Sequence, residues 1–387
     1  MTGFVLSRTP SIAVGPGRCG HVGADVTGLV GEGASILLVA DPGLAASGIT
    51  SRALQALAGA GHRVTVFDGF TADPQEAHVT AGAALAGDTG VQVVVGLGGG
   101  SALDAAKMIA VAAVADRTVE TYRLAAAPLP ARSVRSICIP TTAGTGSEAT
   151  AVSVLTGPDK TKYWFWGDPL KPDLVILDPE LTVGLPAVLT AATGLDALVH
   201  AIEAATNRSA NPANDLHART SIDLAVRYLP RAVVNPGDIE ARTNMLMAAT
   251  MAGVAIDNAG TALAHNIGHA LGSLMPVHHG RAVALAMEAT LPWVIEGNRE
   301  AFTRVAEAFG LGPAPEKLPD AFSALLDRVG FDRSLPQPLD VQVLAARMAA
   351  PENAAMLNAT ARPATADDIQ ALAGAVLRRA GQIPAAA

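Results

Sequence analysis

The chain of 387 residues is 50% hydrophobic and 16% charged, a balance that excludes an intrinsically disordered protein. Its net charge of −8 is spread along the sequence without a basic stripe, which argues against nucleic-acid binding. No uninterrupted apolar run reaches the ~18 residues of a membrane span, and the N-terminus lacks a signal-peptide pattern. Cys19 and Cys138 form no C-x-x-C pair, so we expect neither a disulfide framework nor a cysteine zinc site, and a cytoplasmic location.

Short aliphatic runs alternate with helical segments in the first half of the chain. The runs are almost continuously apolar, which is typical of parallel strands buried on both faces. We therefore predict an α/β layer with helices on both sides of a parallel sheet. The predicted strands are Ser35–Ala40, Arg63–Phe67, Val91–Leu97, Ser136–Pro140 and Leu174–Leu177, and the helices between them include Ser51–Gly61 and Ser101–Ala115.

Strand patterns stop near Pro186, and helical periodicity takes over. We expect two domains: an α/β nucleotide-binding domain over residues 1–184 and an all-α domain over residues 185–387. The predicted helices are Ala187–Thr206, Ala213–Tyr228, Ile239–Ile256, Gly260–Ser273, Arg281–Glu296 and Arg299–Phe309.

A glycine-rich loop, Gly98-Gly99-Gly100-Ser101, follows the strand Val91–Leu97 and opens a helix. Backbone N–H groups and the helix dipole favour an anion there, and glycine lets a phosphate approach closely. Such a loop also occurs where a strand and a helix merely pack tightly. The order differs from the usual dinucleotide-binding pattern, because the acid Asp41 precedes Gly98 by 57 positions (98 − 41).

Two further features fit a dinucleotide. Hydroxyl groups follow the strand Ser136–Pro140 in Thr141-Thr142-Ala143-Gly144-Thr145-Gly146-Ser147, where they can bind phosphate, ribose or the nicotinamide amide. Asp41, at the end of the strand Ser35–Ala40, is placed to pair with the ribose 2′-hydroxyl. A carboxylate there repels the 2′-phosphate of NADP, so the sequence favours NAD.

A carboxylate and several imidazoles are concentrated in the helical half. Asp196 and His200 are spaced i, i+4, which places them on one helical face. His265 and His269 repeat this spacing, and His278-His279 follows after a loop. One carboxylate with imidazoles suits Fe²⁺ or Zn²⁺. The alternative for any single histidine is a hydrogen-bonded core residue, but a cluster of buried acid and imidazole is costly unless paired or metal-bound.

Together these segments resemble the iron-containing (group III) alcohol dehydrogenase family. The resemblance implies a Rossmann-like parallel-sheet domain and an all-α domain, in a dehydroquinate synthase-like architecture, and a homo-oligomer. The matching segments are Gly98-Gly99-Gly100-Ser101-x-x-Asp104, Pro140-Thr141-Thr142-Ala143-Gly144-Thr145-Gly146-Ser147-Glu148, Gly194-x-Asp196-Ala197-x-x-His200-Ala201-x-Glu203, and His265-x-x-x-His269-x-Leu271-Gly272 with His279-Gly280.

The resemblance also implies roles for individual residues. The metal ligands would be Asp196, His200, His265 and His279, with His269 beside the substrate as a proton relay. His279 is preferred to His278 because it directly precedes Gly280. The predicted cofactor-binding residues are Asp41, Gly98, Gly99, Gly100, Ser101, Asp104, Thr141, Thr142, Thr145, Ser147, Lys162 and Leu181.

The expected activity is metal-dependent, NAD(H)-linked oxidation of an alcohol or reduction of an aldehyde, both small molecules. A maleylacetate reductase, a glycerol dehydrogenase or a hydroxyacid–oxoacid transhydrogenase would share most of these motifs. A dehydroquinate synthase-like lyase fits Asp196 less well. A non-catalytic nucleotide- or metal-binding protein is the alternative from another class.

The aromatic run Tyr163-Trp164-Phe165-Trp166 departs from the family pattern.

Overall fold

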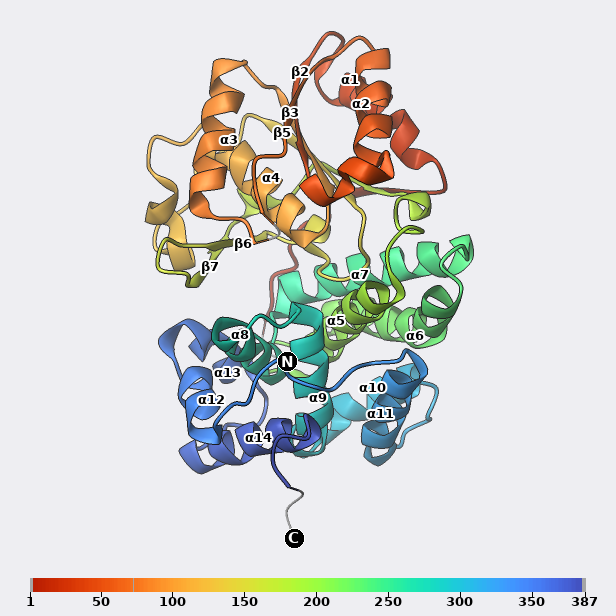
Figure 1. Ribbon diagram of the computed structural model, residues 1–387, viewed down its shortest axis with the longest axis vertical. Coiled ribbons are helices and arrows are strands. Elements are labelled where there is room, and N and C mark those ends of the chain that lie inside the picture. The colour runs from red at the N-terminus through yellow and green to blue at the C-terminus, as the bar shows by residue number, and fades with distance from the viewer. Residues whose placement is uncertain (1–2, 72, 385–387) are drawn as a thin grey trace. The chain divides into compact units, whose positions relative to one another are not determined.

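The computed structural model describes residues 3–71 and 73–384 (Figure 1). The chain divides into two compact units. The α/β unit consists of Arg8–Thr142 and Gly146–Gly184. The helical unit consists of Met1–Ser7, Ala143–Thr145 and Leu185–Ala387, so a three-residue piece of the Thr/Gly-rich loop groups with the helices.

The α/β unit is built on a six-stranded sheet in which every paired strand is parallel. This confirms the predicted parallel α/β layer. The short first strand was not predicted, because four residues carry too little periodicity. In spatial order the strands are β1 (Ser11–Val14), β8 (Leu174–Leu177), β5 (Arg135–Pro140), β4 (Val93–Gly98), β2 (Ser35–Ala40) and β3 (Arg63–Phe67).

Helices cover both faces of this sheet, and alternate residues of one strand serve opposite faces. In β2, Ile36 and Leu38 belong to one apolar cluster, whereas Leu37 and Val39 belong to the other. Figure 1 shows α1 and α2 on one side of the strands and α3 and α4 on the other. These helices are α1 (Val22–Val30), α2 (Ile49–Gly59), α3 (Glu76–Asp88) and α4 (Gly100–Ala112).

The unusual aromatic run forms one strand of an antiparallel hairpin, β6 (Val152–Thr156) with β7 (Lys162–Trp166). Phe165 is buried in the apolar core, whereas Trp166 is exposed. The Arg123 guanidinium lies 4.4 Å from the centre of the Tyr163 ring and is paired with Glu76. The aromatic residues therefore anchor the hairpin to the rest of the unit.

The helical unit is centred on α5 (Ala187–Thr206), which packs against α6, α7 and α9 and is buried over most of its length. By length and composition α5 could cross a membrane, but 78% of that stretch is buried inside the protein, as in a core helix. The other helices are α6 (Pro212–Val234), α7 (Ile239–Ala259), α8 (Leu263–Leu274), α9 (His279–Ile295), α10 (Arg299–Ala308), α11 (Leu318–Arg328), α12 (Val341–Met348), α13 (Ala354–Ala359) and α14 (Ala366–Arg379).

Helices α5 and α9 meet backbone against backbone at Gly280. A Cβ atom at this position would lie 2.1 Å from the carbonyl oxygen of Ala192 and 3.2 Å from Cβ of Asp196. Only glycine permits the two backbones to lie this close. The contact places His279, the first residue of α9, beside the middle of α5.

Replacement of Gly280 by Ala should therefore separate the two helices. We expect the free energy of unfolding to fall by about 1–3 kcal/mol or more, as for other overpacked sites. The matched control is Gly272→Ala in α8, where an added Cβ has no neighbour within 4 Å and the higher helix propensity of Ala should leave stability equal or greater. Chemical denaturation measures both; equal stability of the two variants would contradict the close approach.

Both cysteine thiols are buried and form no disulfide. Burial, and next the charge of Asp178, raises the pKa of Cys19 to about 11, and burial raises the pKa of Cys138 to about 12. At pH 8 only about one Cys19 thiol in a thousand is ionised. We expect Ellman's reagent to detect less than about 0.1 thiol per native chain, and both thiols after denaturation in guanidinium. Rapid reaction of the native protein would contradict this prediction.

Candidate metal and nucleotide sites

Helix α5 places three ionisable side chains in a largely apolar core. Asp196, His200 and Glu203 are spaced i, i+4 and i+7, so they share one face of the helix. All three are buried. Because polar side chains are rarely enclosed without partners, this face marks a site.

The carboxylate of Asp196 is surrounded by imidazoles from three helices. Its Oδ1 lies 3.6 Å from Nε2 of His265 on α8 and 3.8 Å from Nε2 of His279 on α9. Nδ1 of His200 lies 4.0 Å from the same oxygen. The His200 and His265 rings stack with their centres 4.2 Å apart. The structure thus brings together the four residues predicted as ligands.

The spacing of these atoms fits a shared cation. Ligand atoms ~2.1 Å from one ion stand about 3.4 Å apart in a tetrahedral arrangement. In the described part of the chain, six buried side-chain N or O atoms lack a hydrogen-bond partner, and three of them are Asp196 Oδ1, His200 Nδ1 and His265 Nε2. Asp196, His265 and His279 form the tightest group, in which the ligand atoms all lie within 4.8 Å of one another, and His200 is not part of it. A carboxylate with imidazoles is a donor set suited to Fe²⁺ or Zn²⁺.

The electrostatics of the cluster keep Asp196 ionised and His200 neutral, as metal ligands must be, whereas His265 holds an extra proton. Burial opposes ionisation of Asp196, but the imidazoles, His200 first, outweigh it and hold the pKa of Asp196 below its ordinary value. Burial lowers the pKa of His200 to about 4, so this ring is neutral near pH 7. Burial acts likewise on His265, but the charge of Glu203 and the nearby carboxylate of Asp196 outweigh it and raise the pKa of His265 to about 9. A cation would take the place of that extra proton.

Glu203 ends the family-like segment on α5, and the sequence analysis predicts no role for it. The structure shows its contacts. Its carboxylate accepts hydrogen bonds from the backbone N–H groups of Ala262 and Ala264 at 2.7 and 2.6 Å. Oε2 also lies 2.7 Å from Nδ1 of His265. The i+7 spacing from Asp196 on an apolar helix was the available sequence signal.

Two further histidines lie near this cluster. His269, one turn beyond His265 on α8, is half-buried, and its ring centre lies 5.3 Å from that of His279 in an edge-on arrangement. His278 is the residue preceding α9 and is not part of the tightest group, whereas His279 is.

In the α/β unit, the predicted nucleotide residues meet at the carboxyl edge of the sheet. The Asp41 N–H donates to Leu97 O and the Thr141 N–H to Gly98 O, both at 2.9 Å. A Cβ at Gly98 would lie 2.7 Å from Cβ of Asp41, and one at Gly99 would lie 3.4 Å from Oγ1 of Thr142. The chain leaves β2 toward β3 but leaves β4 toward β5, and ligands of open α/β sheets bind at such a switch point.

Helix α4 begins at Gly100, so Gly100 and Ser101 form its first turn. The N-cap residue, Gly99, has no side chain to cap this helix, and N–H groups at such a helix start are suited to bind a phosphate. Asp104 is held within the protein: it accepts hydrogen bonds from the Ser147 hydroxyl and from the Val154 N–H, and lies 3.3 Å from the buried Lys107 ammonium.

The remaining predicted cofactor residues are more dispersed. Thr145 groups with the helical unit. The Lys162 ammonium is on the hairpin and pairs with Asp73 at 3.0 Å. Leu181 is buried in the apolar cluster on one face of the sheet. The structure therefore assembles Asp41, the glycine loop and Thr141–Thr142, but not every residue of the predicted set.

Known proteins are similar to this chain in sequence and in fold. A family model described as iron-containing alcohol dehydrogenase matches residues 9–179, and the C-terminal model of the same family matches residues 190–377. Choline dehydrogenase of Bacillus subtilis (strain 168) is 36% identical over 341 residues, 87% of this chain and 84% of its own length. The NAD-dependent methanol dehydrogenase of Bacillus methanolicus is 35% identical over 311 residues, 80% of each chain.

Solved structures are similar to this chain over nearly its whole length. The sulfoacetaldehyde reductase from Bifidobacterium kashiwanohense, solved in complex with NAD⁺, is 28% identical and superposes with a TM-score of 0.88 over 97% of this chain and 99% of that one. Matches to both family models cover most of the sequence. The chain belongs to the iron-containing alcohol dehydrogenase family and is an oxidoreductase that acts on alcohols.

Proposed function

We propose that the protein is a metal-dependent, NAD(H)-linked alcohol dehydrogenase that interconverts a small alcohol and its aldehyde. The observation that carries this proposal is the buried Asp196 Oδ1 with imidazole nitrogens of His200, His265 and His279 at 3.6–4.0 Å. Such a group is costly to bury unless it shares a cation. The NAD-dependent relative and the NAD⁺ complex of the solved neighbour support the choice of cofactor.

In this proposal Asp196, His200, His265 and His279 hold Fe²⁺ or Zn²⁺. A divalent cation in this place supplies Lewis acidity, which lowers the pKa of an alcohol toward neutrality. The single carboxylate leaves the ion with net positive charge, as a Lewis acid requires. The half-buried His269 then carries the alcohol proton to solvent through its imidazole nitrogens.

In the α/β unit, the first turn of α4 at Gly100 and Ser101 binds the pyrophosphate of NAD, and glycine at Gly98 and Gly99 keeps the approach open. Asp41 binds the adenosine ribose hydroxyls and disfavours NADP. When bound there, NAD would supply the hydride-transfer chemistry. The homo-oligomer and the cytoplasmic location stay predictions.

Removal and restoration of metal test the proposal. Protein stripped with a chelator is reloaded anaerobically with Fe²⁺ or Zn²⁺ and assayed with primary alcohols and aldehydes by nicotinamide absorbance. We expect the stripped protein to be at least roughly 100-fold less active than the reloaded protein, and NAD to be used better than NADP. Full activity after removal of all metal, or no activity with any metal and any alcohol, would contradict the proposal.

Replacement of single histidines separates metal binding from proton transfer. His265→Ala should lose bound metal and turnover together. His269→Ala should keep its metal but lower kcat by about 10²-fold, the usual contribution of an acid–base group. Elemental analysis and steady-state kinetics measure these effects, and His217→Ala on α6, a half-buried histidine outside the cluster, is the control. A His269 variant with an unchanged rate across pH would remove its proposed role.

A further inference from the structure

Glu203 is connected to the cation site without being one of its ligands. It lies one turn beyond His200 on α5 and is 3% exposed. Its Oε2 lies 2.7 Å from Nδ1 of His265, and the other nitrogen of that ring, Nε2, lies 3.6 Å from Asp196 Oδ1. The imidazole of His265 thus bridges two carboxylates, one on each side.

This bridge determines which ring nitrogen of His265 is free for a cation. An ionised carboxylate only accepts hydrogen bonds, so Nδ1 must donate its proton to Glu203. A neutral imidazole carries one N–H group, and the lone pair then lies on Nε2. Nε2 is the nitrogen that faces Asp196. Such an outer carboxylate also makes the ring a stronger ligand.

The same carboxylate caps the helix that carries His265. The residue preceding α8 is Ala262, which has no side-chain cap of its own, so the first N–H groups of α8 need an outside acceptor. Glu203 accepts from the N–H groups of Ala262 and Ala264 at 2.7 and 2.6 Å. One side chain therefore sets both the position of α8 and the orientation of the ring.

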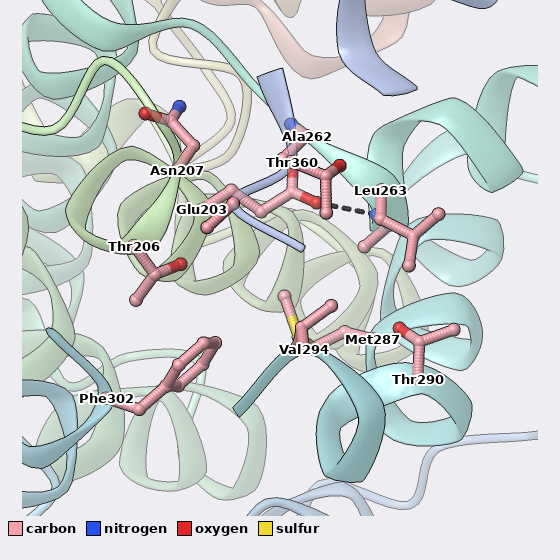
Figure 2. Close-up of a pocket in the computed structure, with 12 residues that line it drawn as sticks. Glu203, Thr206, Asn207, Ala262, Leu263, Met287, Thr290, Val294, Phe302 and Thr360 are labelled. Carbon is pink, nitrogen blue, oxygen red and sulfur yellow. Dashed lines mark hydrogen bonds between the residues drawn. The ribbon is translucent and has the colours of Figure 1, made fainter. Parts of the chain in front are cut away.

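The surroundings of Glu203 keep these bonds strong. Figure 2 shows Glu203 at a small cavity beside Ala262 and Leu263, with Phe302, Met287 and Val294 on the lining. The cavity volume of about 20 Å³ has room for an ordered water, and the Glu203 side chain beside it is buried. Because little water competes there, charge-assisted hydrogen bonds are stronger than at the surface.

A second contact holds the turn before α8 independently of Glu203. Nδ2 of Asn207, at the end of α5, donates to the carbonyl oxygens of Ala259 and Gly260 at 2.9 Å. The α7–α8 turn therefore keeps an anchor to α5 when Glu203 is changed. Variants at Glu203 should fold, which makes the effect of this residue on the cation site measurable.

We propose that Glu203 is a positioning residue of the cation site, which fixes α8 and directs Nε2 of His265 to the ion. This inference rests on the proposed metal dependence. Glu203→Gln keeps the shape but puts an NH₂ group in the place of one carboxylate oxygen. In the place of Oε1 it faces Ala264 N–H, and the start of α8 shifts. In the place of Oε2 it faces both Ala262 N–H and His265 Nδ1–H, so the ring proton moves to Nε2 and blocks it as well.

The test measures metal affinity, without substrate or NAD. Metal-free wild type, Glu203→Gln and Glu203→Asp are titrated with Zn²⁺ against a chromophoric chelator, and with Co²⁺ to record the visible absorption spectrum. We expect the Zn²⁺ Kd of Glu203→Gln to rise roughly 10–100-fold, with an altered Co²⁺ spectrum. Glu203→Asp keeps the charge but withdraws it by about 1.5 Å, so its Kd should also rise, by roughly fivefold or more.

The matched control is Glu288→Gln on α9. Glu288 is equally buried and pairs with Arg333 at 2.8 Å, but it lies nine residues from His279, about 13 Å along the helix. This variant should lower thermal stability and leave the Zn²⁺ Kd unchanged. This control thus distinguishes a general loss of stability from a loss of orientation of the His265 ring.

Two outcomes would overturn the inference, and they are distinguishable. If wild type binds Zn²⁺ and a folded Glu203→Gln or Glu203→Asp variant binds it with a Kd within twofold, Glu203 does not position the site, and the proposed function stands. If metal-free wild type binds neither Zn²⁺ nor Co²⁺, the proposed metal dependence fails, and this inference fails with it.

Discussion

The burial of the Asp196 carboxylate is the constraint on which the helical unit depends. A charge removed from water is costly unless other charges or hydrogen bonds compensate. Around its Oδ1 the fold provides only imidazole nitrogens, none closer than 3.6 Å. The arrangement is therefore too wide for ordinary hydrogen bonds and suited to a shared ion.

Each helix that contributes an imidazole is positioned by a different kind of interaction. α5 carries Asp196 and His200 one turn apart and needs no other element to bring them together. α9 brings His279 by direct backbone contact at Gly280. α8 brings His265 through hydrogen bonds to Glu203.

The nucleotide site that we propose in the α/β unit has the opposite electrostatic requirement. An anion such as a pyrophosphate needs positive potential without bulky side chains, and a glycine turn before a helix offers free N–H groups. Parallel pairing sets the ends of β2, β4 and β5 side by side, so residues far apart in sequence meet at one edge. Asp41 reaches this edge from a different strand than the glycine loop, which explains why the usual spacing rule does not describe this chain.

The sequence pattern predicted the central strands and the long helices well, because buried parallel strands and core helices carry strong periodic signals. It missed β1, α1, the β6–β7 hairpin, α3 and the helices after α10. The missed strands are short. The residues in the central part of α3 are almost all small and apolar, so this helix shows no distinct apolar face in the sequence. α9 begins at His279, two residues earlier than predicted, because His278 precedes it in an extended conformation.

By itself the sequence determined the alternation of strands and helices along the chain and the i, i+4 spacing of Asp196–His200 and His265–His269, because helical and strand periods are local properties of the chain. Only the tertiary structure decided that three helices bring His200, His265 and His279 to one carboxylate oxygen, and that Glu203 holds the ring of His265. These contacts join residues up to 83 positions apart (279 − 196). They are fixed by helix packing, and no local pattern encodes that distance.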